Sequence, residues 1–103
     1  MLFGKKRREE NVFPFADSPN TAAFVCCHVL EGERPVLRVT HDEDGYWQFL
    51  CGGGHTEAEA RVVSLEEAYS IDRSTGALAG MDYGCTAERD RTGGEWRIAR
   101  NGE

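Results

Sequence analysis

Two cysteine–histidine pairs are the residues of this sequence best suited to chemistry: Cys26-x-His28 and Cys51-x-x-x-His55. Alternate residues of a strand project from the same face, so Cys26 and His28 can reach one ion if both lie in a strand. If Cys51 and His55 lie beside them, the four side chains form a tetrahedral set of two thiolates and two imidazoles, which suits zinc. The sequence therefore predicts a candidate zinc site at Cys26, His28, Cys51 and His55.

The same four residues allow two other interpretations. Free cysteines are commonly small core residues, and in that case Cys26 and Cys51 build the core, His28 is a satisfied polar group and His55 lies in a loop. Alternatively, one of the two cysteines is a nucleophile paired with one of the histidines, which requires a thiolate stabilised by a base or a helix N-terminus. No signature of a thiol enzyme surrounds either cysteine, so the sequence predicts a protein that is not an enzyme.

The charge of the chain is unevenly distributed. The 103 residues carry a net charge of −6, but the basic cluster at residues 5–8 contributes +4, so residues 9–103 carry −10. An acidic body argues against nucleic-acid binding, because affinity for nucleic acids depends largely on neutralising phosphates. An acidic surface suits a basic protein partner instead.

The length predicts one folded unit, with a flexible basic leader at residues 1–20 and a single α+β domain at residues 21–103. Pro14 and Pro19 interrupt any helix in the leader, whereas Phe13 and Phe15 can dock on the domain. No apolar run approaches the roughly 18–20 residues that span a bilayer, and the first residues lack the apolar segment of a secretory signal. We therefore expect no membrane association and a cytoplasmic location, where the cysteines stay reduced.

Three apolar runs, at residues 23–30, 36–41 and 46–51, predict an antiparallel meander. A five-residue connection follows the first run, and an Asp-Gly turn at residues 42–45 follows the second. Trp47 and Phe49 share one face of the third strand and are expected in the core, with Tyr46 on the opposite face.

A helix and a hairpin complete the predicted fold. Ser64 and Glu67 form a capping box that predicts a helix over about residues 64–71. Its buried side is expected to consist of Leu65, Ala68, Tyr69 and Ile71. Residues 84–90 and 95–99 predict a closing hairpin. The predicted fold is α+β, an antiparallel sheet of about five strands (meander plus C-terminal hairpin) with one or two short helices on one face.

The order of these features resembles a small bacterial domain-of-unknown-function family that includes immunity-type proteins of polymorphic toxin systems. The resemblance is carried by Asp44-Gly45-Tyr46-Trp47-Gln48-Phe49-Leu50-Cys51-Gly52, Val63-Ser64-Leu65-Glu66-Glu67-Ala68, Asp72, Leu78, Gly84, Glu88 and Arg89. Gly53, Gly54 and His55 stand where that family has acidic residues. The resemblance implies an α+β fold with an antiparallel sheet and a toxin partner, and it supplies no catalytic residues.

Charge and resemblance together predict a small cytosolic, non-enzymatic binding protein, immunity-like, whose acidic surface engages a basic, toxin-like protein partner. The alternative is a structural zinc-binding domain that uses Cys26, His28, Cys51 and His55, with zinc as its only cofactor.

Overall fold

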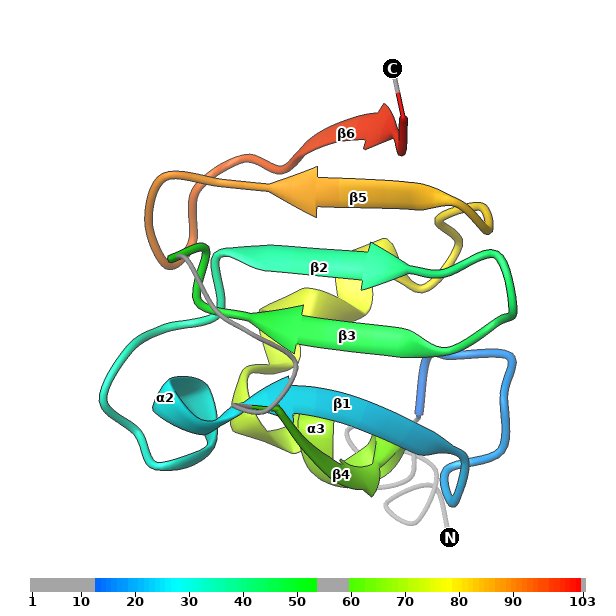
Figure 1. Cartoon of the computed structure of the whole chain (residues 1–103), viewed down its shortest axis with the longest axis horizontal. Coiled ribbons are helices and arrows are strands. Elements are labelled where there is room, and N and C mark those ends of the chain that lie inside the picture. The colour runs from blue at the N-terminus through cyan, green and yellow to red at the C-terminus, as the bar shows by residue number, and fades with distance from the viewer. Residues whose placement is uncertain (1–12, 54–59, 103) are drawn as a thin grey trace, which may run out of the picture.

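The computed structural model describes residues 13–53 and 60–102. Within these residues one sheet has six strands in the order β4-β1-β3-β2-β5-β6. The strands are β1 (Ala22–Cys26), β2 (Arg38–His41), β3 (Trp47–Leu50), β4 (Ala60–Ser64), β5 (Cys85–Glu88) and β6 (Arg97–Arg100). The helical elements are α2 (Cys27–Leu30), α3 (Leu65–Ile71) and the 3-10 helix η2 (Arg73–Leu78). Figure 1 shows α3 and η2 behind the sheet, on the face away from the viewer.

The α+β class is confirmed, but the sheet is mixed and has six strands. β1 pairs in parallel with β3, with Ala23 opposite Trp47, and every other described pairing is antiparallel. The predicted hairpin between residues 23–30 and 36–41 is wrong, because the second half of the first run is helical. Gly32, with φ of +79°, follows α2 and lets the chain leave it. The connection then carries β2 to the far side of β3.

The predicted turn at residues 42–45 and the predicted closing hairpin are confirmed. Between β2 and β3 the Gly45 amide donates to the Asp42 carbonyl at 2.9 Å, and Gly45 has φ of +96°. Glycine adopts this left-handed conformation without the steric cost that a Cβ would add. β5 and β6 form the closing hairpin, with Thr86 opposite Ala99.

The capping box at α3 is confirmed by its first hydrogen bond, in which the Glu67 amide donates to Ser64 Oγ at 3.0 Å. Leu65 and Ala68 are fully buried beneath the sheet, as expected. Ile71 is 39% exposed, so its predicted burial is wrong; α3 ends at this residue and the chain turns at Asp72. None of the helices in the described part of the chain is long and apolar enough to cross a membrane.

The core fills the space between the covered face of the sheet and α3. Trp47 and Phe49 are 2% and 0% exposed, which confirms their predicted burial. Phe15 packs edge-on against Trp47 at 4.9 Å between ring centroids, a contact worth about 0.5–1.5 kcal/mol beyond its buried area. Phe13 lies 5.5 Å from Phe15, so the predicted docking of both phenylalanines is confirmed. The basic cluster at residues 5–8 lies outside the described residues.

A buried arginine joins three segments at the end of β5. Arg89 is 3% exposed and donates to the Val36 carbonyl from Nε at 3.1 Å and from Nη2 at 3.0 Å. The same guanidinium donates to Ser74 Oγ at 2.9 Å and to the Asp72 carboxylate at 2.7 Å. Trp96 covers its face at 4.1 Å. We call this set the Arg89 cluster; it ties β5 to η2 and to the segment before β2.

Candidate metal centre

The carboxyl ends of β1 and β3 place two cysteines side by side. Cys26 is the last residue of β1, and Cys51 directly follows β3. Because these strands are parallel neighbours, both ends lie at the same edge of the sheet, next to α2 (Figure 1). In the predicted meander β2 would separate the two cysteines. The direct pairing of β1 with β3 removes that separation.

The helix α2 adds a histidine to this pair. Cys26 is the N-cap residue of α2, with an extended backbone, and the chain then turns so that His28 approaches the two sulfurs. The Sγ atoms of Cys26 and Cys51 and a ring nitrogen of His28 all lie within 4.8 Å of one another. The structure thus brings together three of the four predicted ligands, through a helical turn rather than a shared strand face. We call these three residues the Cys/His cluster.

Burial has the largest effect on the pKa of the Cys26 thiol. Only 1% of this residue is exposed, and burial raises the pKa of its thiol above the ordinary value of 9.0. Hydrogen bonds from the backbone N–H groups of Val29 and Cys51 act in the opposite direction, because they favour the thiolate, and the nearby Cys51 thiol adds a smaller upward contribution to the pKa. A cation that replaces the thiol proton would keep these two N–H···S contacts.

A basic side chain lies against the second sulfur. Arg34 Nη1 donates to Cys51 Sγ at 3.8 Å, and the amides of Glu33 and Arg34 donate to the His28 carbonyl, which folds this loop onto α2. A Cβ at Gly53 would lie 3.0 Å from Arg34 Nη1 and 3.7 Å from Cys51 Sγ. Because residue 53 is a glycine, the Arg34 side chain has room to reach the Cys51 sulfur.

Sequence reasoning missed Arg34, because its segment was interpreted only as a strand connection. One signal was available: Arg34 is the only lysine or arginine between Arg8 and Arg38, in a stretch rich in acidic residues. A single basic residue in an acidic stretch suggests that a specific neighbour requires its charge.

The dimensions of the Cys/His cluster suit a small tetrahedral cation. Zinc takes sulfur ligands at about 2.3 Å and nitrogen ligands at about 2.0 Å, which sets the ligand atoms about 3.5–3.8 Å apart. The observed spread of up to 4.8 Å narrows to this size with side-chain shifts of about 1 Å. Two sulfurs and an imidazole nitrogen are also donors that zinc prefers over the oxygen ligands that calcium and magnesium take.

The fourth predicted ligand and the other two cysteines are not part of the described cluster. His55 falls outside the described residues, so its role as fourth ligand stays a prediction. Cys27 and Cys85 are not members of the cluster. Cys85 lies on β5 opposite His41, whose ring stacks on Trp47 with centroids 3.8 Å apart.

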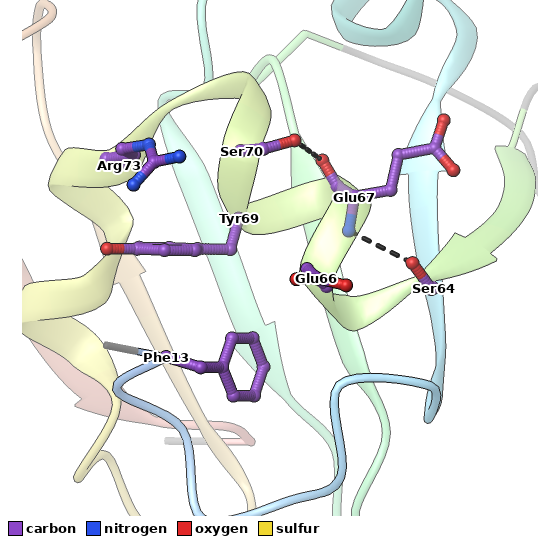
Figure 2. A pocket seen from close by; sticks show the side chains of 7 residues that line it. All are labelled: Phe13, Ser64, Glu66, Glu67, Tyr69, Ser70 and Arg73. Atoms are coloured by element: carbon purple, nitrogen blue, oxygen red, sulfur yellow. Dashed lines mark hydrogen bonds between the residues drawn. The ribbon is translucent and has the colours of Figure 1, made fainter. Parts of the chain in front are cut away.

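A surface hollow of about 480 Å³ beside α3 is a second candidate site. Figure 2 shows the Tyr69 ring between Phe13 and Arg73, and Arg73 lies 5.5 Å from the ring centroid. Two of the hydroxyls that line the hollow are engaged by the helix itself, since Ser64 accepts from the Glu67 amide and Ser70 donates to the Glu67 carbonyl at 2.7 Å. The sulfurs and the ring nitrogen of the Cys/His cluster, by contrast, lie within 4.8 Å of one another.

No known family model matches the chain, and no curated protein or solved structure matches it. The protein is therefore classed by its own fold and site. It is an α+β domain with a mixed sheet and a cysteine–histidine cluster at the ends of two parallel strands. The family resemblance drawn from the sequence motifs stays a prediction.

Proposed function

We propose that the chain is a non-enzymatic domain that binds one zinc ion through Cys26, His28 and Cys51. The observation that carries this proposal is the convergence of two sulfurs and a ring nitrogen within 4.8 Å. These atoms come from β1, from α2 and from the residue after β3. A zinc ion bound to all three would hold together the ends of two strands and the helix between them.

Burial favours a structural role for this zinc. Cys26 and Cys51 are 1% and 6% exposed, whereas a catalytic zinc keeps one position open for water or substrate. The contact from Arg34 to Cys51 fits the same role, because hydrogen-bond donors around a metal-bound thiolate orient it and offset its charge. The sequence prediction of His55 as the remaining ligand would close the coordination shell.

Elemental analysis of the full-length chain, purified without a tag or chelator, tests this function. We expect one zinc per chain in the unmodified protein and in the control variant Cys27→Ser, because Cys27 lies outside the cluster. Cys51→Ser and Cys26→Ser should lose the zinc, and His55→Ala tests the predicted fourth ligand. Absence of zinc from the unmodified chain, or its full retention in Cys51→Ser, would contradict the proposal.

A second candidate function is binding of a basic, toxin-like protein, as charge and resemblance predict. The supporting observation is an apolar patch on the face of the sheet opposite α3, made among the described residues by Val62, Phe24 and Tyr46. Val62 and Tyr46 are 62% and 41% exposed, Phe24 pairs with Val62 and contacts the Tyr46 ring edge-on at 5.9 Å. The exposed residues Glu43 and Asp44 lie in the β2–β3 turn, shortly before Tyr46.

Exposed apolar and aromatic side chains beside charges are typical of interface centres. We expect a basic partner to bind this patch with an affinity that falls as salt rises, since exposed charges are screened. In pull-downs, a basic protein that is retained at low salt should be lost from the double variant Val62→Ser/Tyr46→Ser. Ile98→Ser, which removes an exposed apolar side chain from β6, is the control. Equal retention by both variants would overturn this candidate.

A further inference from the structure

Two of the three atoms in the Cys/His cluster are sulfurs on adjacent strand ends. The Sγ atoms of Cys26 and Cys51 lie within 4.8 Å of each other. Neighbouring strands about 4.8 Å apart with a rise of about 3.3 Å per residue put diagonal Cα atoms about 6 Å apart. Disulfides join Cα atoms that are roughly 4.4–6.8 Å apart, so these two cysteines can be bridged with little backbone movement.

We propose that Cys26 and Cys51 are a redox-active pair that a low-molecular-weight disulfide such as oxidised glutathione converts to an intramolecular disulfide, and that this disulfide and bound zinc exclude each other. The formation of the disulfide is inferred from the geometry of the two cysteines alone. The mutual exclusion rests on the proposed zinc site, because each sulfur has either the metal or the other sulfur as its bonding partner.

The exchange proceeds in two balanced steps. First, the Cys51 sulfur attacks one sulfur of oxidised glutathione, the S–S bond of the small molecule breaks, and one glutathione thiolate leaves. Then the Cys26 sulfur attacks Cys51 in this mixed disulfide, and the second glutathione leaves. The protein gives up two electrons and two protons, and oxidised glutathione takes up both to become two thiols.

The structure favours Cys51 as the first sulfur to react. It is the more exposed of the two, at 6% against 1% for Cys26, and the side chain against it belongs to the exposed Arg34. Movement of the Arg34 side chain would expose more of the Cys51 sulfur. The guanidinium also attracts the carboxylates of glutathione, although the exposed Glu31 and Glu33 on the same loop weaken that attraction. Cys26, which is more deeply buried, then resolves the mixed disulfide from inside.

Cys27 is the natural competitor, because it follows Cys26 directly and is half-buried. It begins α2 and lies outside the cluster, so it is not placed to reach Cys51. The variant Cys27→Ser is therefore a matched control that removes one thiol next to the pair without touching it.

The test uses the full-length chain, metal-free and zinc-loaded, in oxidised glutathione, with free thiols counted by alkylation and mass spectrometry. We expect the metal-free chain and Cys27→Ser each to lose two thiols without a glutathione adduct. Cys26→Ser should instead stop at one glutathione adduct on Cys51. With free zinc at about one hundred times its Kd, about one chain in a hundred is metal-free, so oxidation should slow about a hundredfold.

The outcomes separate this inference from the proposed function. Retention of all four thiols by the metal-free chain, or loss of the disulfide in Cys27→Ser, would overturn the redox pair whether or not zinc binds. Disulfide formation that zinc does not slow would overturn the mutual exclusion and count against the zinc site, while the redox pair would stand. Circular dichroism of each variant separates a folding defect from a lost thiol reaction.

Discussion

The Arg89 cluster and the Cys/His cluster both join segments that are distant in the sequence, and they differ in what their buried polar atoms contact. Arg89 directs its guanidinium donors at the Val36 carbonyl, Ser74 Oγ and the Asp72 carboxylate, and Trp96 covers its face. Its positive charge thus meets a negative one 2.7 Å away inside the protein. This cluster is complete within the chain.

The Cys/His cluster brings together atoms that can all donate a lone pair to a metal. Two sulfurs and an imidazole nitrogen converge, and all three are electron-pair donors to metals once deprotonated. The N–H groups that surround the sulfurs, from Arg34 and from the backbone at Val29 and Cys51, are donors that a metal-bound thiolate continues to use. In the Arg89 cluster every guanidinium nitrogen donates to an acceptor, as in a structural joint, whereas the converging lone pairs of the Cys/His cluster are the feature on which the proposed zinc site rests.

Removal of Arg89 should have the largest effect. Arg89→Ala leaves the Asp72 carboxylate and the Val36 carbonyl without this partner. Loss of one member of a fully buried ion pair costs about 3–5 kcal/mol, and we expect the lower end of this range because the Asp72 side chain is 18% exposed. The control is Arg97→Ala, which breaks an exposed ion pair with Asp90, worth about 0–1 kcal/mol. The free energy of unfolding is measured by urea denaturation at fixed zinc. Equal losses in the two variants would show that the Arg89 cluster is no structural joint.

Zinc should change the stability of the chain through the other cluster. At a free concentration one hundred times its Kd, an ion that binds only the folded state raises the free energy of unfolding by about 2.7 kcal/mol. Denaturation with and without zinc should show this increment in the unmodified chain and in Cys27→Ser, and none in Cys51→Ser. An increment that survives in Cys51→Ser would place the bound metal elsewhere.

The arginine beside the cluster should tune zinc affinity without contacting the metal. Arg34→Ala removes the donor to Cys51 Sγ, and loss of such an outer partner weakens metal binding about 10- to 100-fold. Gly53→Ala should weaken binding in the same direction, because its methyl group would lie 3.0 Å from Arg34 Nη1. Competition with a chromophoric chelator measures both affinities, with Arg38→Ala as the control, since Arg38 pairs with Glu88. Unchanged affinity in Arg34→Ala would remove Arg34 from the site.

The smallest effect concerns the metal-free chain at alkaline pH. Because burial raises the pKa of Cys26 above 9.0, the folded chain keeps this thiol proton at a pH where the unfolded chain has lost it. The associated stabilisation is complete below about pH 9 and is lost as the pH rises through the folded-state pKa. Unfolding measured from pH 8 upward should show a shallower decline for Cys26→Ala than for the unmodified chain. Parallel declines would contradict the assignment.

Local signals in the sequence predicted much of the fold. The turn at residues 42–45, the capping residue Ser64, the β5–β6 hairpin and the burial of Trp47 and Phe49 all depend on residues close in sequence. The pairing of β1 with β3 was missed, because residues 23–30 form one apolar run whose second half is helical. Apolar runs of this length do not distinguish a strand from a helix. Because α2 follows β1 directly, the chain does not turn back in a hairpin, and β3 rather than β2 pairs with β1.

Three of the four predicted metal ligands lie together in the structure, whereas His55 lies outside the described residues and the surroundings of the cluster were not predicted. Cys26, His28 and Cys51 were identified from residue type and spacing, and the structure brings them together. Arg34 and Gly53 were missed, because their roles depend on a loop that folds back onto the His28 carbonyl. The contact of Arg34 with Cys51, which joins residues 17 positions apart, has no periodic sequence pattern by which it is recognised in advance.

X-ray absorption at the zinc edge identifies the atoms bound to the metal and so tests whether Cys26 and Cys51 are zinc ligands. For the full-length chain loaded with one equivalent of zinc, we expect two sulfur neighbours at about 2.3 Å and nitrogen neighbours at about 2.0 Å. Cys51→Ser should lose one sulfur, whereas Cys27→Ser should keep both. A zinc shell of oxygen and nitrogen alone, or the same two sulfurs in Cys51→Ser, would contradict this assignment.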